Sequence, residues 1–122
     1  MKVRAIDFVQ IGVADMDRAV RFYRDTLGMD FPLSGGDDTD RNWTEFDTPP
    51  VALELARVGP APGQVSLALA VDDVAAAVAE LRAKGVPIVM EAREQDVCVA
   101  AVIRAPDGNE LILHRRKDGT AG

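Results

Sequence analysis

The feature that most constrains this chain is an internal repeat with a spacing of 58 residues. The repeat aligns residues of the same type in the two halves of the chain: Val13 with Val71, Asp15 with Asp73, Ala19 with Ala77, Val20 with Val78, Arg24 with Arg82, Leu53 with Leu111, Leu55 with Leu113 and Arg57 with Arg115. This spacing is longer than the roughly 20- to 50-residue periods of solenoid proteins. We therefore expect two copies of one folded module rather than a stacked array of small repeats.

The best-patterned part of the first copy is a strand followed by a helix. Residues 6–13 are mostly β-branched and apolar, which is typical of a strand. Asp15 then stands at the N-cap position of a helix near residues 16–27, and Gly28 can adopt the left-handed conformation that ends it. The apolar stripe of this helix, which we expect to face the core, consists of Met16, Ala19, Val20, Tyr23 and Leu27.

The second copy begins with the same two elements. Residues 65–71 predict a strand, and a helix is expected near residues 74–84, with Asp73 as its N-cap and Gly85 after its end. The apolar stripe of this helix consists of Val74, Ala77, Val78 and Leu81.

Short β segments and turns fill the rest of each copy. Strands are expected at 31–33, 42–46, 51–58, 86–90, 97–103 and 110–115, with loops or turns at 34–38, 48–50, 59–63 and 106–109 and a frayed tail at 117–122. Each copy is thus a βαβββ module. We expect one α+β domain over residues 1–122, with modules at 1–58 and 64–116 that form a curved mixed sheet around a cavity, the helices lying on its outer face.

The composition argues against several classes of protein. Apolar residues make up 48% of the chain and charged residues 28%, so the chain is globular rather than disordered. The net charge of −6 argues against nucleic-acid binding, which needs a basic face. Cys98 is the only cysteine, so there is no intramolecular disulfide. No stretch has the apolar character of a signal peptide or a membrane span, so we expect a cytoplasmic protein without a membrane partner.

Several short motifs, in order and spacing, resemble the vicinal oxygen chelate superfamily, which includes glyoxalase I, extradiol dioxygenases, and fosfomycin- and bleomycin-resistance proteins. They are VADM and RFYRDTLG in the first half, and VDDV, KGV and PDGN in the second. The resemblance covers nearly the whole chain and implies the duplicated βαβββ fold. It also implies a homodimer, because family members commonly complete their cavities by pairing modules from two chains.

Enzymes of this superfamily hold a divalent metal with one residue from each of four strands, typically two His and two Glu. The resemblance places these positions at Phe8, Glu54, Ser66 and Ile112. Of these side chains, Glu54 alone is a good ligand for such an ion, and one carboxylate cannot hold it against water. We therefore expect no bound metal and no cofactor.

Strand alternation predicts which side chains line the cavity, because successive side chains point to opposite faces. The shift of 58 places Asn42 and Thr44 opposite Ala100 and Val102, on the cavity side. The expected ligand-binding residues are Phe8, Gln10, Asn42, Thr44, Glu54, Ser66, Cys98, Val102, Ile112 and His114.

Four side chains that could take part in binding or catalysis have two interpretations each. Glu54 would be a cation-binding or general-base carboxylate, or a solvated or arginine-paired group at the cavity mouth. His114 would act as an acid or base with Glu54, or be a hydrogen-bonded rim residue. Cys98 could be a nucleophile, but the sequence favours the interpretation that it is a small buried hydrophobic residue. Trp43 falls on the helix side by the shift of 58 and would pack in the core; the alternative is stacking on a flat ligand.

Three functions fit these residues. The absence of the usual ligand set favours a metal-free small-molecule-binding protein, similar to the bleomycin-resistance branch, that sequesters an antibiotic or another hydrophobic or cationic metabolite. The alternative is a metal-independent lyase, isomerase or hydrolase that uses Glu54, with or without His114, as acid or base. The third is a protein with a vestigial pocket and a role in assembly or regulation.

Overall fold

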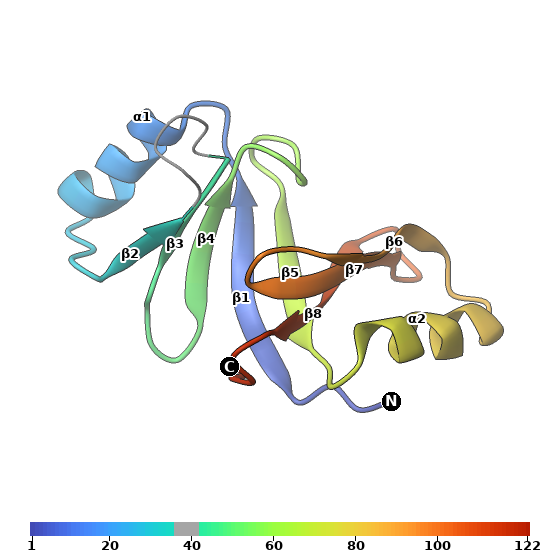
Figure 1. Ribbon diagram of the computed structural model, residues 1–122. Coiled ribbons are helices and arrows are strands. Elements are labelled where there is room, and N and C mark those ends of the chain that lie inside the picture. The colour runs from blue at the N-terminus through green and yellow to red at the C-terminus, as the bar shows by residue number, and fades with distance from the viewer. Residues whose placement is uncertain (36–41) are drawn as a thin grey trace. The chain divides into compact units, whose positions relative to one another are not determined.

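The computed structural model describes residues 1–35 and 42–122, coloured along the chain in Figure 1. The elements are β1 (Ala5–Gly12), α1 (Met16–Arg21), η1 (Phe22–Thr26), β2 (Leu33–Gly35), β3 (Trp43–Phe46), β4 (Ala52–Ala56), β5 (Val65–Ala70), α2 (Val74–Ala83), β6 (Ile88–Glu94), β7 (Cys98–Arg104) and β8 (Glu110–Arg116). The order βαβββ occurs twice, which confirms the predicted α+β class and the duplicated module.

The chain forms two compact units. The first-half unit is Phe8–Val65, and the second-half unit is Met1–Asp7 together with Ser66–Gly122. In the first-half unit the strands lie in the order β2-β3-β4-β1, with β1 and β4 parallel and the other neighbours antiparallel. In the second-half unit the order is β5-β8-β7-β6, with β5 and β8 parallel and the other neighbours antiparallel.

The repeat of 58 is visible in the hydrogen bonds that follow the first strand of each copy. The amide of Val13 donates to the carbonyl of Ala56 at 2.8 Å, and the amide of Val71 donates to the carbonyl of His114 at 3.0 Å. Val13 and Val71 are therefore equivalent, as predicted. The two N-caps are confirmed as well, because the carboxylates preceding α1 and α2 each accept a hydrogen bond from an amide in the first turn.

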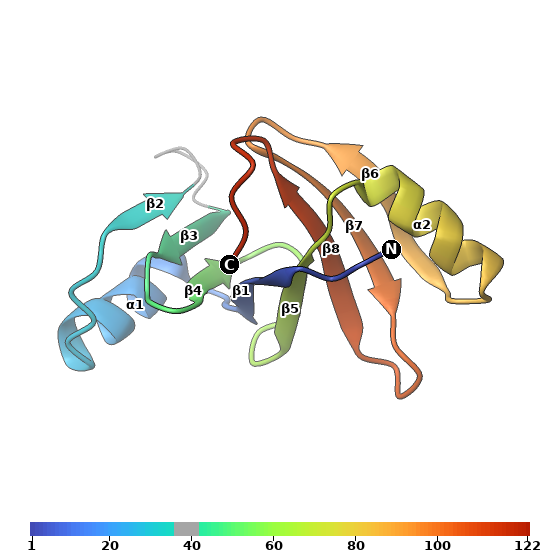
Figure 2. The same ribbon diagram turned by 90° about the horizontal axis from the view of Figure 1, so that it is seen from below.

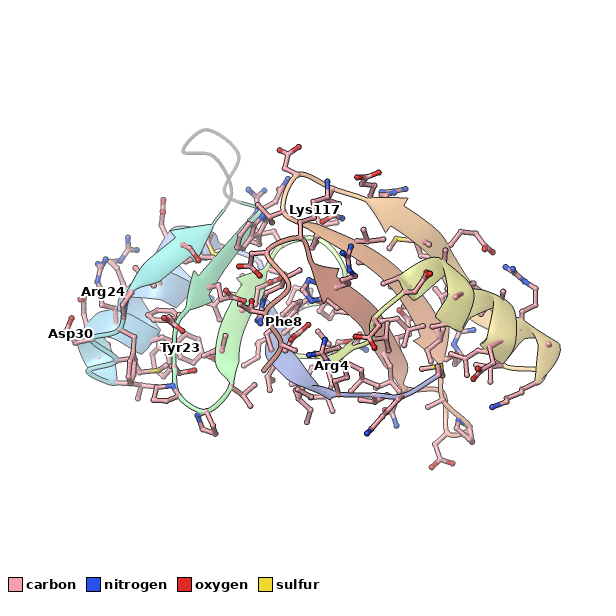
Figure 3. All side chains as sticks on the ribbon, turned by 60° about the horizontal axis from the view of Figure 1, so that its bottom comes forward. Arg4, Phe8, Tyr23, Arg24, Asp30 and Lys117 are labelled. Atoms are coloured by element: carbon pink, nitrogen blue, oxygen red, sulfur yellow. The ribbon has the colours of Figure 1, made fainter. Side chains whose placement is uncertain are left out.

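The first helix packs on β3 and β4 through its apolar stripe. Met16 and Val20 form a core cluster with Phe46 and Leu55. Tyr23 packs against this cluster with its ring centroid 6.4 Å from that of Phe46. Figure 3 shows Tyr23 on the strand side of the helix, with Arg24 and Asp30 on its outer side.

The last turn of the first helix differs from the prediction. Residues Phe22–Thr26 form a π-helix, and the amide of Leu27 bonds to the carbonyl of Phe22 at 3.0 Å. The wider i to i+5 turn rotates the side chains that follow it relative to an α-helical stripe. Leu27, which was expected in the core, is 54% exposed for this reason.

The second helix matches its prediction closely. Its stripe residues Val74, Ala77 and Val78 are buried, and they pack with Ala101 and Leu113 of the adjacent strands. Figure 2 shows α2 running alongside β6. Side chains at i, i+3 and i+4 face the same way on an α-helix, so this run of small and branched residues forms one continuous contact with the sheet.

Two strand boundaries differ from the prediction for the same reason. The expected strand at 31–33 is found at Leu33–Gly35, and the expected strand at 86–90 is found at Ile88–Glu94. Each observed strand begins directly after a proline, Pro32 or Pro87. Proline lacks the N–H that a strand ladder uses, so each proline only accepts a hydrogen bond from the neighbouring segment, and the regular strand begins at the next residue. The loop expected at 34–38 therefore begins with strand residues, and its remaining residues, 36–38, lie outside the described part of the chain.

The expected linker at 59–63 packs tightly against β1. The amide of Gly12 donates to the carbonyl of Gln64 at 2.9 Å, and the amide of Gly63 donates to the carbonyl of Gly12 at 3.1 Å. A side chain at position 12 would collide with the carbonyl oxygens of Pro60 and Ala61. Glycine is thus required here because backbone lies directly over its α-carbon.

The C-terminal tail does not fray, contrary to the prediction. The amide of Gly122 donates to Oδ1 of Asp7 at 2.9 Å, and its carbonyl accepts a hydrogen bond from Arg116 at 3.1 Å. These charge-assisted bonds hold the tail in place.

Candidate functional site

The side of β1, β3 and β4 that faces away from α1 carries the most distinctive residues of the first-half unit. The strand registers arrange them in rows across the sheet: Phe8 with Ala52; Gln10 with Glu54 and Glu45; Gly12 with Ala56 and Trp43. We call this surface the Glu54 face. Phe8, Gln10 and Glu54 share it, as strand alternation predicted.

Glu54 lies in the middle of the central row and is 9% exposed. The amide Nε2 of Gln10 donates a hydrogen bond to its Oε1 at 2.7 Å. Along β4 its neighbours on this face are Ala52 and Ala56. Glu54 is therefore the one buried carboxylate of the first-half unit's described residues, and it is held in a fixed orientation.

Burial gives Glu54 an unusual titration. It raises the pKa of this carboxyl from 4.5 to about 7; the hydrogen bond from Gln10 lowers the pKa, and the negative charge of Glu45 raises it. The largest cause is desolvation, which disfavours the charged form. At neutral pH the group is therefore poised to accept or release a proton, a property concentrated at functional sites.

Two residues of β3 lie on the opposite faces to those expected. Thr44 pairs with Leu55 of the core cluster and faces α1, whereas Trp43 pairs with Ala56 and lies on the Glu54 face. The cause is a local change in the repeat: Ala100 pairs with His114 as Trp43 pairs with Ala56, so β3 and β7 are related by 57 residues rather than 58. A shift of one residue reverses every side chain of a strand. Asn42, the other residue placed by the shift of 58, directly precedes β3 and is half-buried.

The second-half unit carries an equivalent surface on the side of its sheet that faces away from α2. The residues on this side, named here the His114 face, are Ser66, Ala68, Ala70, Cys98, Ala100, Val102, Ile112 and His114. Val99, Ala101 and Ile103 pack toward the helix cluster. The faces expected for β5, β7 and β8 are therefore confirmed.

Two polar side chains of the His114 face are already engaged. The Ser66 hydroxyl donates to the carbonyl of Glu110 at 2.9 Å. The thiol of Cys98, which is buried, donates to Oε1 of Gln95 at 3.3 Å. The geometry of Cys98 agrees with the interpretation of a small buried residue better than with an activated nucleophile.

His114 belongs to a buried charge network that sequence reasoning missed. Its Nδ1 lies 2.6 Å from Oδ2 of Asp7, whose side chain is fully buried. Arg116 donates to Oδ1 of Asp7 at 3.3 Å and to the Asp7 carbonyl at 3.0 Å. In the sequence, Asp7 is a polar residue within the mostly apolar strand expected at 6–13. The signal that could have found it is a carboxylate inside a buried strand in a chain with one histidine, because such a carboxylate needs a partner.

A family model, the Glyoxalase/Bleomycin resistance protein/Dioxygenase superfamily, matches residues 5–113. The chain belongs to this superfamily. Within the described residues no helix is long and apolar enough to cross a membrane. A comparison with curated proteins finds no match.

Solved structures of the superfamily share the fold. A methylmalonyl-CoA epimerase in complex with methylmalonyl-CoA and NH4+ is 21% identical, with a TM-score of 0.72 over 99% of this chain and 100% of that chain. A Streptomyces coelicolor methylmalonyl-CoA epimerase variant in complex with 2-nitronate-propionyl-CoA is 20% identical, with a TM-score of 0.72 over 99% and 100%. The Mycobacterium tuberculosis methylmalonyl-CoA epimerase is 28% identical, with a TM-score of 0.66 over 92% and 87%.

The donor set does not fit the divalent metal that superfamily enzymes use. In the part of the chain that the structure describes, no three His, Cys, Asp or Glu side chains gather as a metal site would require. At the usual ligand positions, Phe8 and Ile112 offer no lone pair, and the Ser66 hydroxyl is bonded to a backbone carbonyl. Glu54 remains as one carboxylate, which is too few ligands for such an ion.

Proposed function

We propose that this protein binds a small organic molecule on the Glu54 face without the help of a metal, and that Glu54 is the polar anchor of the site. The observation that carries this proposal is the buried Glu54 carboxyl, oriented by Gln10 and flanked along β4 by two alanines. A buried carboxyl is costly to keep and stabilises the fold little, so a use in ligand binding explains its presence.

The surroundings of Glu54 are apolar. Phe8, Ala52 and Ala56 share its face and are themselves buried, so a ligand group that reaches Glu54 enters an environment of low polarity in which a hydrogen bond to this carboxyl is strengthened. A few fixed polar groups then set the orientation of the ligand. Gln10 already donates to one oxygen of Glu54, so the remaining capacity of this carboxylate favours a ligand that carries a hydrogen-bond donor or a positive charge.

A thermal-shift screen of natural products and antibiotics, followed by calorimetry of each hit, tests this proposal. We expect Glu54→Gln to weaken binding of cationic or donor ligands by roughly 1–3 kcal/mol, the scale of a charge-assisted hydrogen bond. Glu91→Gln, which changes a carboxylate of an exposed ion pair on β6, is the matched control and should leave affinity unchanged. Hits that bind Glu54→Gln and the wild type equally would show that Glu54 is not the anchor.

A metal-independent acid–base enzyme is the second candidate. It is favoured by the pKa of Glu54, which burial raises to about 7, because a general base works best when its pKa lies near the working pH. Similar structures include enzymes, the methylmalonyl-CoA epimerases. The two candidates differ in what becomes of the ligand. A binder returns each hit unchanged after incubation in D2O, whereas a proton-transfer enzyme returns it deuterated, isomerised or cleaved.

A further inference from the structure

We propose that Trp43 forms an aromatic wall of the Glu54 site and that the site takes a planar cation with N–H donors, of the amidinium or guanidinium class. This inference rests on the proposed function and names the ligand chemistry of the same site.

The strand registers bring Trp43 and Glu54 together. Trp43 pairs with Ala56 and Glu45 pairs with Glu54, so Trp43 and Glu54 are diagonal neighbours across β3 and β4 on one face. Diagonal neighbours in an antiparallel pair lie roughly 7–8 Å apart, within reach of an aromatic side chain. Trp43 is half-buried, and the residue opposite it is an alanine.

The charges of this face select a cation. Glu54 and Glu45 stand side by side in the central row, and Glu45 lies close enough to raise the pKa of Glu54. Glu54 is buried and receives its hydrogen bond from the neutral amide of Gln10. A bound cation would offset the desolvation of the Glu54 carboxylate.

The combination of a carboxylate and an indole narrows the kind of cation. An amidinium or guanidinium is planar, stacks on an aromatic ring and donates two parallel hydrogen bonds to a carboxylate. A quaternary ammonium is attracted to the indole face as well, but it has no N–H to donate. The Glu54 face should therefore bind a planar cation with N–H donors more tightly than a quaternary ammonium.

Three benzene derivatives separate these contributions: benzamidine is a planar cation with donors, benzamide is its neutral near-isostere, and phenyltrimethylammonium is a cation without donors. Calorimetry at pH 8, where Glu54 is largely ionised, should show benzamidine binding at least about tenfold tighter than either of the others. Because Trp43 is the only tryptophan, benzamidine should also change the protein's tryptophan emission saturably, with the same dissociation constant.

Substitutions assign the effect to the residues. Trp43→Leu should weaken benzamidine binding by about 5- to 30-fold and Trp43→Phe by less, on the scale of a cation–π contact. Phe22→Leu, which changes an exposed aromatic residue of η1, is the control and should have no effect. Glu54→Gln should abolish the preference for benzamidine over benzamide. The wild-type emission titration needs no substitution, so it stands even if a Trp43 variant folds poorly.

The outcomes separate this inference from the proposed function. Benzamidine binding that leaves both tryptophan emission and the affinity of Trp43→Leu unchanged would overturn the role of Trp43. Equal affinity for benzamidine and benzamide, or no binding of benzamidine, would overturn the ligand class. Either result leaves the proposed function intact as long as hits from the screen depend on Glu54.

Discussion

At the scale of single residues, the described part of the chain contains two buried carboxylates with opposite surroundings. Asp7 accepts hydrogen bonds from Arg116 and from the Gly122 amide and lies against His114, so its charge is compensated. Glu54 receives one hydrogen bond from Gln10 and lies beside another carboxylate. A buried charge is stable where partners surround it and costly where they do not. The surroundings of Asp7 are those of a structural carboxylate, whereas those of Glu54 are typical of a carboxylate that binds a ligand.

Stability should therefore depend on pH through Glu54. The pKa of Glu54 is about 7 in the folded protein, whereas its ordinary value, which applies to the unfolded chain, is 4.5. The folded state therefore holds this proton more tightly than the unfolded state. The contribution of Glu54 to the free energy of unfolding is fully present below pH 4.5 and is lost as the pH rises to about 7. Between pH 4.5 and 7 the free energy of unfolding of the wild type should fall by up to about 3 kcal/mol relative to that of Glu54→Gln. Urea denaturation of both proteins between pH 4.5 and 8 measures this, and parallel curves would contradict it.

Removing Asp7 should strongly destabilise the fold. Asp7→Ala leaves Arg116 and His114 without their buried partner, and breaking a buried ion pair in this way costs about 3–5 kcal/mol. Asp72→Ala is the matched control, because it breaks an exposed ion pair with Arg4 and should cost at most about 1 kcal/mol. Chemical denaturation compares the two variants, and equal losses would show that the Asp7 network contributes no more than a surface pair.

At the scale of the elements, the π-helix η1 determines which side chains at the end of the first helix face the core. It interrupts the i, i+3, i+4 pattern after Tyr23, so the helix contributes its first two turns to the core and presents Leu27 to solvent. The corresponding helix α2 has no such interruption and buries its stripe along its length. The two copies of the module thus differ in this element and in the register of β3.

Two leucine substitutions test this difference. Leu27→Ala should reduce the free energy of unfolding by less than about 0.5 kcal/mol, because the side chain is exposed. Leu55→Ala removes the same atoms from the core cluster and should cost about 2–5 kcal/mol. Denaturant titrations of the two variants give the comparison. A large loss for Leu27→Ala would mean that its side chain packs as a regular α-helix would place it.

At the scale of the whole molecule, the chain is a duplication of one βαβββ module with the strand orders β2-β3-β4-β1 and β5-β8-β7-β6 in its two units. Equivalent amides after β1 and β5 bond to the equivalent carbonyls of Ala56 in β4 and His114 in β8. The duplication accounts for two similar sheet faces with different chemistry. The first presents a carboxyl group of raised pKa, and the second presents an imidazole held by an aspartate.

We expect the protein to form a homodimer in solution. β2 stands at the end of one strand order and β6 at the end of the other, and such strands expose unpaired backbone groups that natural proteins cover. Twofold dimers are the commonest oligomers of soluble proteins, and pairing of identical chains would cover such strands. Light scattering at micromolar concentration should give twice the chain mass of 13.1 kDa, and a monomer mass would contradict the prediction.

The sequence by itself determined the elements and their repetition. The N-caps Asp15 and Asp73 and the glycines Gly28 and Gly85, which have positive φ angles, act on the residues next to them. Apolar spacing likewise reports on single helices and strands. Such local signals suffice to predict two βαβββ modules, and strand alternation correctly placed Phe8, Gln10 and Glu54 on one face.

Only the tertiary structure decided which side of β3 faces the site and how Asp7 is tolerated. A difference of one residue between the two copies moves Trp43 to the Glu54 face and Thr44 to the helix side, because side chains alternate along a strand. Asp7 is compensated by His114, 107 residues away in the sequence, and by the returning tail. A carboxylate inside a buried strand indicates that a partner is needed, but neither the register of a strand nor the identity of a partner at that separation can be read from the residues nearby, since both are set by contacts that exist only once the chain has folded.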